Sequence, residues 1–579
     1  MRSPPFRGAP RDERGASPTA VITMPSFLES IFEQLRRAAN RVVLREVRGK
    51  EFVSVSGQEL LEQVQSAREV IRDAQLRPGD RCALLGANSI RWVAADLALM
   101  AEGLIVVPLY ARQAPGELAG MIEDCGARLL LTSEVAAGQS LTEAIPDRVR
   151  QISLEELVQR GAPQKRALEP PAPRSDSDIV TIIYTSGTSG EAKGVCLTQA
   201  NLNHMLACTT ERLNHLMQHL GGKTVDRVFH YLPMNFAASW LLMLSCLSRE
   251  SELTLSTNLN QLADEILLAA PHYFLNVPTL LERVRRGVEE NLAKRPRPIR
   301  SLFSKASDAW QRRRVGRGGT ADVFWLALGR RAIFAAIKKR FGPHLRALIC
   351  GSAPLAPETQ QFFLMLGIPV LQAYGLTETT GICTMDDPRL PIDPGGVGLS
   401  IPGIAMKLGE NDEILVSGPN IFAGYWNRPD ATAQAVRDGW FHTGDQGQVS
   451  VRGNWRVIGR IKNLIILNSG HNIAPEPIED RIAQRLSRAQ HVVLVGNGRG
   501  YICALITGAV DRQAVQAALD AVNADLPHYR QIRNFIVLNE PLTAENGLLT
   551  ANGKLRRDAI NSRFSSEIAA LYQQRAAAG

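Results

Sequence analysis

The chain has 579 residues, of which 45% are hydrophobic and 21% charged, and its formal net charge is +9. This length exceeds one ordinary core, and the composition excludes a disordered or fibrous chain, so we expect a soluble globular protein with several lobes. The eight cysteines are widely spaced without a Cys-x-x-Cys pair, which argues against a zinc cluster or a disulfide framework and favours a reducing, cytoplasmic setting.

The beginning of the chain differs from the rest. Residues 1–23 contain proline, arginine and serine but lack the hydrophobic core of a signal peptide, and we expect a flexible tail there. Met24, which stands just before a helical pattern, is a candidate for the true start.

No apolar run in the chain approaches the roughly 20 residues that cross a bilayer, and the richest, Trp240–Leu247, predicts a buried helix.

Helical patterns alternate with short apolar runs along the first part of the chain, which is typical of parallel sheets covered by helices. The expected strands are 81–86, 104–109, 128–132, 179–184, 346–350 and 369–374. After about residue 410 the pattern changes to short strands and turns, which indicates a small β subdomain. The residues that follow have strands and helices enough for an independent α+β lobe.

These patterns predict an α/β protein. We expect a large N-terminal domain of helix-covered sheets with a small β subdomain over residues 24–460, a hinge at 461–463, and a small mobile α+β C-terminal lid domain over 464–579.

The positive charge gathers in one segment. Residues 283–340 contain seventeen basic and four acidic residues, with five large aromatic residues among them. Such a segment favours either a surface that touches anionic lipid headgroups or a solvated set of helices with snorkelling arginines, and the sequence leaves both open. Nucleic acid fits the charge, but no recognised nucleic-acid module accompanies it.

The strongest chemical signal is the string Tyr184-Thr-Ser-Gly-Thr-Ser-Gly-Glu-Ala-Lys-Gly-Val195. Its glycines permit a tight turn, its hydroxyls and backbone N–H groups can surround an anionic phosphate, and Lys193 adds a cation. The spacing excludes a Walker loop, because Ala192 stands where that motif needs its second glycine.

This string resembles the signature loop of the acyl-adenylate-forming (AMP-binding) superfamily, which includes acyl-CoA synthetases, luciferases and the adenylation domains of peptide synthetases. Four further stretches are similar to the other motifs of that family and occur in its order: Gln372–Gly381, Trp440–Gly447, Gly459–Asn463 and Asn552–Arg556. The similarity therefore covers nearly the whole chain from Met24 to Arg557.

The resemblance implies a role for each matched residue. ATP and Mg²⁺ are the implied cofactors, with Thr185 and Glu378 holding the metal and Thr377 contacting the α-phosphate. Lys554, Thr377 and Glu378 are the implied catalytic residues, and Lys554 would bridge the attacking carboxylate and the phosphate. The implied nucleotide-binding positions are Thr185, Ser186, Gly187, Thr188, Ser189, Gly190, Lys193, Gly351, Ser352, Ala353, Ala373, Tyr374, Gly375, Asp445 and Arg460.

The family resemblance also implies a second step with coenzyme A. The C-terminal lobe would swing about Lys462, withdraw the lysine and open a pantetheine channel that Gly470 lines closely because it has no side chain. Two positions depart from the family pattern. Phe236 replaces a histidine that often gates the carboxylate pocket, and Asn463 replaces an acidic residue after the hinge, which puts the details of lobe rotation in doubt.

The basic segment and the stretch 545–550 resemble the long-chain fatty acid branch of the family, and the run 237–247 suits an apolar acyl tunnel. We therefore expect a fatty acid to be activated as acyl-AMP and passed to coenzyme A, with possible peripheral membrane contact and no nucleic acid partner. Three alternatives stay open: a fatty acyl-AMP ligase that loads an acyl carrier protein, a β-lactone synthetase, and a non-catalytic lipid-binding relative.

Overall fold

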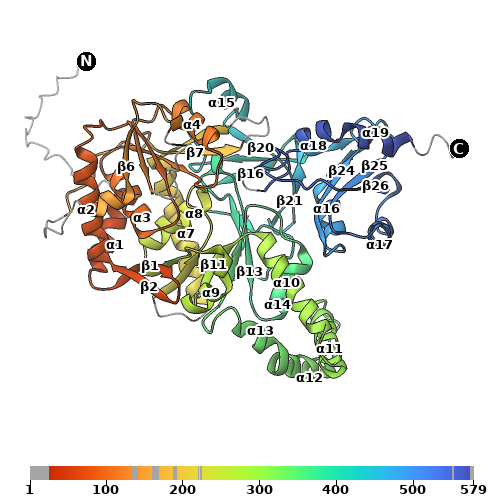
Figure 1. Ribbon diagram of the computed structural model, residues 1–579. Helices are drawn as coiled ribbons and strands as arrows, with labels where there is room; N and C mark the ends of the chain where they lie inside the picture. Colours follow the sequence, from red (N-terminus) through yellow and green to blue (C-terminus); the bar gives the residue numbers. More distant parts are fainter. Residues whose placement is uncertain are drawn as a thin grey trace, which may run out of the picture.

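Two large sheets with helices between them form the body of the protein, and a smaller lobe at the C-terminal end sits beside it (Figure 1). The structure is a computed structural model that describes residues 25–133, 141, 143–159, 168–186, 192–219, 221, 225–550 and 553–573. The expected tail of residues 1–23 lies outside the described residues.

The first large sheet has seven strands in the order β18-β8-β7-β4-β3-β5-β6. The strands β3, β4, β5 and β6 are parallel, and β4 also pairs parallel with β7, as the alternating pattern predicts. The bounds are β3 Arg81–Leu85, β4 Ile105–Leu109, β5 Leu129–Thr132, β6 Arg150–Ser153, β7 Ile179–Ser186, β8 Ala192–Thr198 and β18 Gly424–Tyr425.

The second large sheet has nine strands in the order β15-β14-β13-β12-β11-β9-β10-β1-β2. Its central strands are parallel, while β2, β14 and β15 are antiparallel to their neighbours. The bounds are β1 Val42–Arg48, β2 Glu51–Ser56, β9 Asp226–His230, β10 Ser251–Leu255, β11 Tyr273–Asn276, β12 Leu348–Cys350, β13 Val370–Tyr374, β14 Thr384–Met385 and β15 Leu399–Ser400.

Helices fill the space between these sheets and share one hydrophobic core with them. Ser26 and Ser56 cap the first two helices through capping boxes with Glu29 and Glu59, which satisfies backbone donors that a helix start leaves open. The helices are α1 Phe27–Arg37, α2 Gly57–Arg72, α3 Ile90–Ala101, α7 Gln199–His219 and α8 Ala237–Leu247. All but one residue of α8 is buried, so the prediction of a buried helix at 240–247 is confirmed.

Shorter helices complete the body: α4 Pro115–Asp124, α6 Leu154–Gln159, which packs against α2 and α3, α9 Leu262–Ala269, α14 Pro357–Met365 and α15 Pro429–Ala435. A third sheet follows, in the order β16-β17-β20-β19 with β21 paired to β20. Its strands are β16 Ala405–Leu408, β17 Glu413–Ser417, β19 Val436–Arg437, β20 Trp440–Val449 and β21 Trp455–Arg460, which together are the predicted small β subdomain.

The C-terminal lobe has a sheet of its own, β24-β25-β26, with separate apolar clusters on its two faces. Its elements are β22 Ile465–Ile466, β23 Asn472–Ile473, α16 Glu476–Ala483, β24 Ala489–Val495, β25 Ile502–Gly508, α17 Arg512–Asn523, β26 Ile532–Leu538, α18 Arg557–Arg563 and α19 Ser565–Gln573. The predicted fold class is thereby confirmed, while the exact domain limits and the hinge stay predictions.

The basic segment 283–340 folds as helices that project from the body at one end of the molecule (Figure 1). They are α10 Pro278–Ala293, α11 Arg297–Arg314, α12 Thr320–Gly329, a π-helical turn Arg330–Phe334 and α13 Ala335–Lys339. Among the described residues no helix has both the length and the apolar character that crossing a bilayer requires. The eight cysteines are buried and free.

Candidate active site

A cavity of about 1930 Å³ lies between the body and the C-terminal lobe. The carboxyl ends of β7, β12 and β13 reach it, as ligand sites in open α/β sheets commonly do. The third sheet contributes β20 and β21, and the lobe contributes the turn before α18. Residues from motifs nearly 370 positions apart thus face one space, and among them are Thr185, Glu378, Asp445 and Lys554.

One polar corner of the cavity is built around Asp445, which is almost fully buried on β20. The Arg460 guanidinium binds one carboxylate oxygen at 2.8 Å, and the Tyr374 hydroxyl donates to the other at 2.7 Å. Strand pairing fixes this arrangement, because Asp445 and Arg460 are direct partners across β20 and β21. Burial raises the pKa of Asp445, and the Arg460 charge counteracts it. This corner offers a carboxylate to a ribose diol.

A second acidic group, Glu378, lies in the 3₁₀ turn Thr377–Thr379 that follows β13. Its carboxylate accepts a hydrogen bond of 2.8 Å from the Tyr425 hydroxyl. The Lys193 ammonium group lies 5.1 Å from the centre of the Tyr425 ring, which is a cation–π distance. Tyr425, which lies in none of the recognised motifs, therefore connects the signature hairpin to the acid.

The signature string forms an antiparallel hairpin of β7 and β8 and is not a direct strand-to-helix connection. Thr185 pairs with Lys193 at the end of the hairpin where the two strands are joined, and the Thr185 hydroxyl donates to the Lys193 carbonyl at 3.5 Å. Gly187, Thr188, Ser189 and Gly190 lie outside the described residues, as does the Ser186 side chain. Their predicted contacts with phosphate stay predictions. Oxygen donors such as Thr185 and Glu378 suit Mg²⁺, so both residues fit the implied metal.

At one wall of the cavity two backbone segments lie very close to each other. A Cβ at Gly375 would lie 2.4 Å from the Ile382 Cα, so only glycine fits between these two turns. Ser352 has a φ of +72°, a left-handed conformation that serine rarely adopts. This strained turn, together with Gly351, Ala353 and Ala373, lines the cavity beside Tyr374. The predicted adenine-side residues are thus brought together.

Lys554 reaches the cavity from the C-terminal lobe. The Thr550 side chain accepts from the Lys554 backbone N–H at 3.1 Å, and Gly553 has a φ of +75°, so a tight turn presents the lysine. Lys554 is exposed as a whole residue, but partial desolvation at the cavity and the like charge of Arg460 lower the pKa of its ammonium group, while Asp445 and Glu378 partly offset both effects. The side chain therefore sits within electrostatic reach of both acids.

An apolar arm extends from this polar region into the body. It is lined by Leu241 and Leu242 on α8, by Leu213 on α7 and by Met385 on β14. Ser245 and Thr209 also line it, but their hydroxyls are paired with each other at 2.8 Å and with helix carbonyls. The arm therefore has few polar groups that a ligand could engage. Phe236 lines the cavity at the start of α8.

The two residues that the resemblance assigns to the coenzyme A step, Lys462 and Gly470, lie differently relative to this cavity. Lys462 lines the cavity, and the pKa of its ammonium group is lowered by burial and by Arg460. Gly470 stands apart, in the turn between β22 and β23, where a Cβ would meet no atom within 4 Å. Its role in a pantetheine channel stays a prediction.

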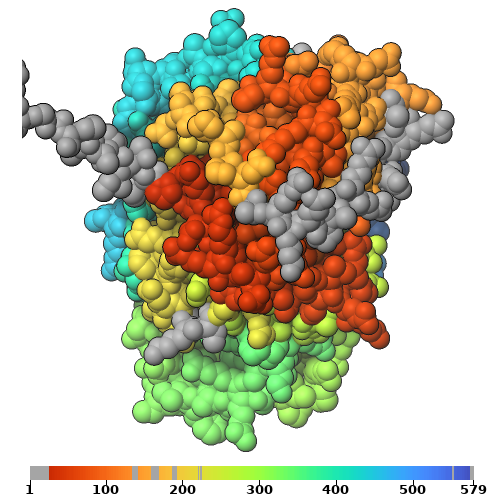
Figure 2. Space-filling view, turned by 90° about the vertical axis from the view of Figure 1, so that its left-hand side faces the viewer, coloured from red at the N-terminus to blue at the C-terminus, as the bar shows by residue number. Residues whose placement is uncertain are grey.

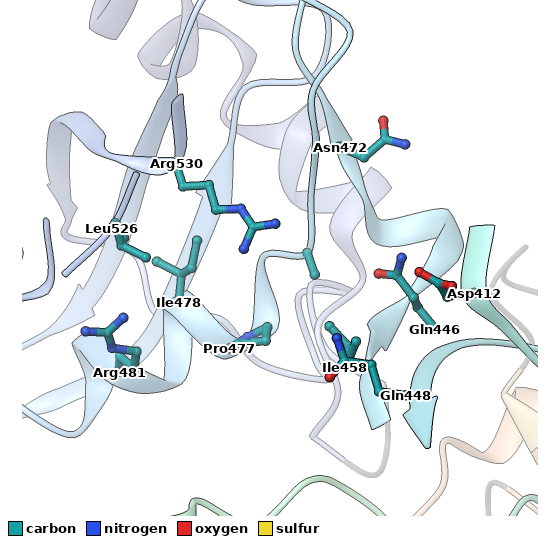
Figure 3. A pocket seen from close by; sticks show the side chains of 11 residues that line it. Asp412, Gln446, Gln448, Ile458, Asn472, Pro477, Ile478, Arg481, Leu526 and Arg530 are labelled. Atoms are coloured by element: carbon teal, nitrogen blue, oxygen red, sulfur yellow. The ribbon is translucent and has the colours of Figure 1, made fainter. Parts of the chain in front are cut away.

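A smaller pocket of about 370 Å³ lies on the other face of β20. Asp445 faces the large cavity, while Gln446 and Gln448 face this pocket together with Arg530 of the lobe (Figure 3). Its other cation, Arg481, is paired with Asp525 at 2.7 Å. None of the predicted nucleotide-binding residues lines it, so the larger cavity is the candidate nucleotide site.

Comparison with known families agrees with this geometry. The model of the family described as AMP-binding enzyme matches residues 31–426, and the model of the AMP-binding enzyme C-terminal domain matches residues 462–576. The chain belongs to the AMP-binding enzyme family. The family prediction made from the motifs is thereby confirmed.

Individual AMP-binding enzymes are similar over nearly the full length. The long-chain-fatty-acid–CoA ligase FadD15 of Mycobacterium bovis is 27% identical, with 96% of this chain and 99% of that protein covered. Long chain acyl-CoA synthetase 3 of Arabidopsis thaliana is 26% identical over 87% of this chain and 84% of its own.

Among solved structures, O-succinylbenzoate coenzyme A synthetase from Bacillus subtilis, in complex with ATP and magnesium ion, has a TM-score of 0.68. It is 21% identical, and 91% of this chain and 98% of that chain are covered. At this identity the likeness supports the shared two-part fold alone.

Proposed function

We propose that this AMP-binding enzyme activates a long-chain fatty acid with ATP, releases pyrophosphate, and transfers the acyl group from the adenylate to coenzyme A. The observation that carries the proposal is a single cavity in which the Lys554 ammonium group, the Asp445 carboxylate and the Glu378 carboxylate meet the mouth of an apolar arm. Relatives that are named long-chain-fatty-acid–CoA ligases along the full chain support the same conclusion.

In the first step a carboxylate oxygen of the fatty acid attacks the α-phosphorus of ATP, and the bond to pyrophosphate breaks. Two anions must approach each other, and negative charge grows on the phosphoryl oxygens, so cations that converge there lower the barrier. Lys554 supplies one such cation from the lobe, and Lys193 supplies another from β8. Mg²⁺ held by Glu378 and Thr185 would neutralise further phosphate charge.

The nucleotide is held by groups that are already oriented. The Asp445 carboxylate, fixed by Arg460 and Tyr374, accepts the ribose hydroxyls. The turns at Gly351 and Gly375 provide the flat space that an adenine ring needs beside Tyr374. Because these groups are positioned before the substrate binds, little reorganisation is needed during the reaction.

The apolar arm is the proposed acyl site. A long alkyl chain gains roughly 0.8 kcal/mol for each methylene that leaves water, so a dry arm favours long acids. Leu213, Leu241 and Leu242 give that surface, and the Ser245–Thr209 pair satisfies the hydroxyls within it. The arm meets the polar region near Phe236, where the carboxylate of the acid would lie.

In the second step the coenzyme A thiolate attacks the acyl carbon, and the bond between that carbon and the AMP oxygen breaks. Lys554 occupies the cavity in the present lobe orientation, whereas Gly470 lies outside it. We therefore assign this orientation to adenylation, with thioester formation after the lobe has turned about Lys462.

A product assay tests the proposal. Purified protein with MgATP, coenzyme A and fatty acids of graded chain length should form AMP and acyl-CoA in equal amounts, as separated by chromatography. Parallel reactions with an acyl carrier protein, and with a 3-hydroxy acid without coenzyme A, test the ligase and β-lactone alternatives. If the acyl group went only to the carrier protein, the carrier would be the acceptor in place of coenzyme A. If only a ring product formed, the enzyme would be a β-lactone synthetase. No AMP under any condition would favour the non-catalytic alternative.

A further inference from the structure

Helices α11 and α12, here called the basic hairpin (residues 297–329), form a projection at one end of the molecule. Figure 1 shows them beyond the sheets of the body and away from the C-terminal lobe. Figure 2, which is turned by 90°, shows the same green segment at the lower end of the protein. The projection is thus reachable by a broad surface that would not have to enter a cleft.

The inner side of the basic hairpin is packed. Ala306 and Ala309 of α11 are fully buried, and a Cβ at Gly329 of α12 would lie 2.6 Å from the Ala306 Cβ. The helices therefore approach closely because small residues face each other. Asp322 accepts from the Gly319 backbone N–H at 2.9 Å and from the Arg312 side chain, which fixes the start of α12. The hairpin is a defined structural unit.

The outer side of α12 is apolar and exposed. Val323, Phe324, Ala327 and Leu328 fall at positions that share one helix face, and all four are exposed. Phe324 is 60% exposed and Val323 51%. These side chains lie on the face opposite Leu326, which is buried. They contribute little to the core, and an amphipathic helix of this kind normally turns its apolar face toward a partner.

Basic residues flank α12 along the chain. Arg313, Arg314 and Arg317 are exposed at and beyond the end of α11, where the Arg314 side chain also donates to the Ile392 carbonyl, and Arg330 and Arg331 are exposed directly after α12. Segment 283–340 as a whole has seventeen basic residues against four acidic ones. An apolar face bordered by guanidinium groups is complementary to a bilayer whose headgroups are anionic and whose interior accepts apolar side chains.

We propose that the basic hairpin docks this protein on the surface of an anionic membrane. The arginines lie against the headgroups while Phe324 and its neighbours on α12 enter the interface. This contact is peripheral, and it does not depend on the proposed enzyme activity. Docking would also keep the protein beside a source of long-chain acids. The cavity is connected to the hairpin through α10, which lines the cavity with Pro278, Thr279 and Glu282 and leads directly into α11.

Vesicle flotation tests the proposal with the full-length protein. Wild-type protein should bind vesicles of phosphatidylcholine with 30% phosphatidylglycerol and should not bind pure phosphatidylcholine. The double variant Arg313→Glu/Arg317→Glu should bind anionic vesicles roughly 30-fold more weakly or worse, because each cation near an anionic surface contributes to attachment. Phe324→Ser should bind about tenfold more weakly, because one large apolar contact is lost.

Matched variants elsewhere on the surface control for charge and for apolar exposure. Lys50→Glu/Arg77→Glu makes the same change in net charge at exposed sites in the body, and Val451→Ser removes an exposed apolar residue from another loop. Both should bind like wild type, and circular dichroism should be unchanged in all variants.

Three results would overturn the proposal. Equal binding to neutral vesicles and anionic vesicles would exclude headgroup recognition, and hairpin variants that bind like wild type would exclude this surface. A concentration-dependent dimer that only Phe324→Ser abolishes would identify a second copy of the chain as the partner of α12.

Discussion

The body and the C-terminal lobe contribute to the cavity in different ways. Asp445 of the body is buried, and a strand partner and a tyrosine hydroxyl hold its carboxylate in place. Lys554 of the lobe stands on a tight turn in which its backbone N–H donates to the Thr550 hydroxyl and Leu549 pairs with Leu555 in an isolated bridge. Under the proposed function, this difference makes the body a prearranged frame for the nucleotide, whereas the lobe would present a cation that moves with its turn.

Removal of the lobe's cation should have the largest effect. We expect Lys554→Ala to lower the rate of adenylate formation by roughly a hundredfold or more, the usual scale for the loss of one preorganised charge donor. Transfer from preformed acyl-AMP to coenzyme A should change little, and single-turnover assays of each half-reaction measure the two effects. Arg563→Ala, which removes an exposed cation from the same lobe, is the control. Equal losses in both half-reactions would contradict the separate role of the lobe.

A substitution at Asp445 in the body should weaken the use of ATP. Asp445→Asn leaves Arg460 without its charged partner and weakens the acceptor for ribose, interactions of roughly 1.5–3 kcal/mol. We expect kcat/KM for ATP to fall roughly 10- to 100-fold. Asp430→Asn, at an exposed position in α15, should leave it unchanged. If the fall appeared in kcat/KM for the fatty acid alone, the assignment of this corner to ribose would be wrong.

The acyl arm of the body can be tested by filling it. Leu242→Trp places a larger side chain where Leu242 lines the cavity. We expect the ratio of kcat/KM for a long acid to that for a short acid to fall about tenfold, because a few methylenes lose their site. Retained activity with the short acid shows that the variant is folded. An unchanged ratio would place the acyl chain elsewhere.

The smallest expected effect concerns pH. Surrounding protein and the Arg460 charge lower the pKa of Lys554, so its positive charge is lost at a lower pH than in an ordinary lysine. As pH rises through this lowered pKa, kcat/KM for adenylate formation should decline, because only the ammonium form assists. Lys554→Arg should keep its charge and shift the decline to higher pH. A decline at the same pH in both proteins would assign it to another group.

Much of the body could be predicted from local patterns. The buried runs at β3, β4 and β5 are continuous and apolar, as strands covered on both faces are, and their bounds were predicted to within about one residue. By contrast, β20 extends over Trp440–Val449 through two glycines and several polar residues, so no apolar run marks it as a strand. Its pairing with β17 and β21 overrides its weak local preference.

The site was predictable where a motif marks it and not where contacts assemble it. Asp445 and Lys554 stand in recognisable strings, and the structure brings both to one cavity. Tyr425 has no such string, and its link to Glu378 arises from strand β18, which pairs with β8 from far along the chain. The exposed apolar face of α12 was also hidden, because the sequence does not say which side of a helix packs.

Exchange of labelled pyrophosphate into ATP tests the central claim, that one cavity joins a fatty acid to AMP, most directly. With Mg²⁺, ATP and a long-chain fatty acid, and without coenzyme A, the protein should incorporate label, and omission of the acid should stop the incorporation. Exchange that never rises above the level without acid, over a full range of chain lengths, would contradict the account.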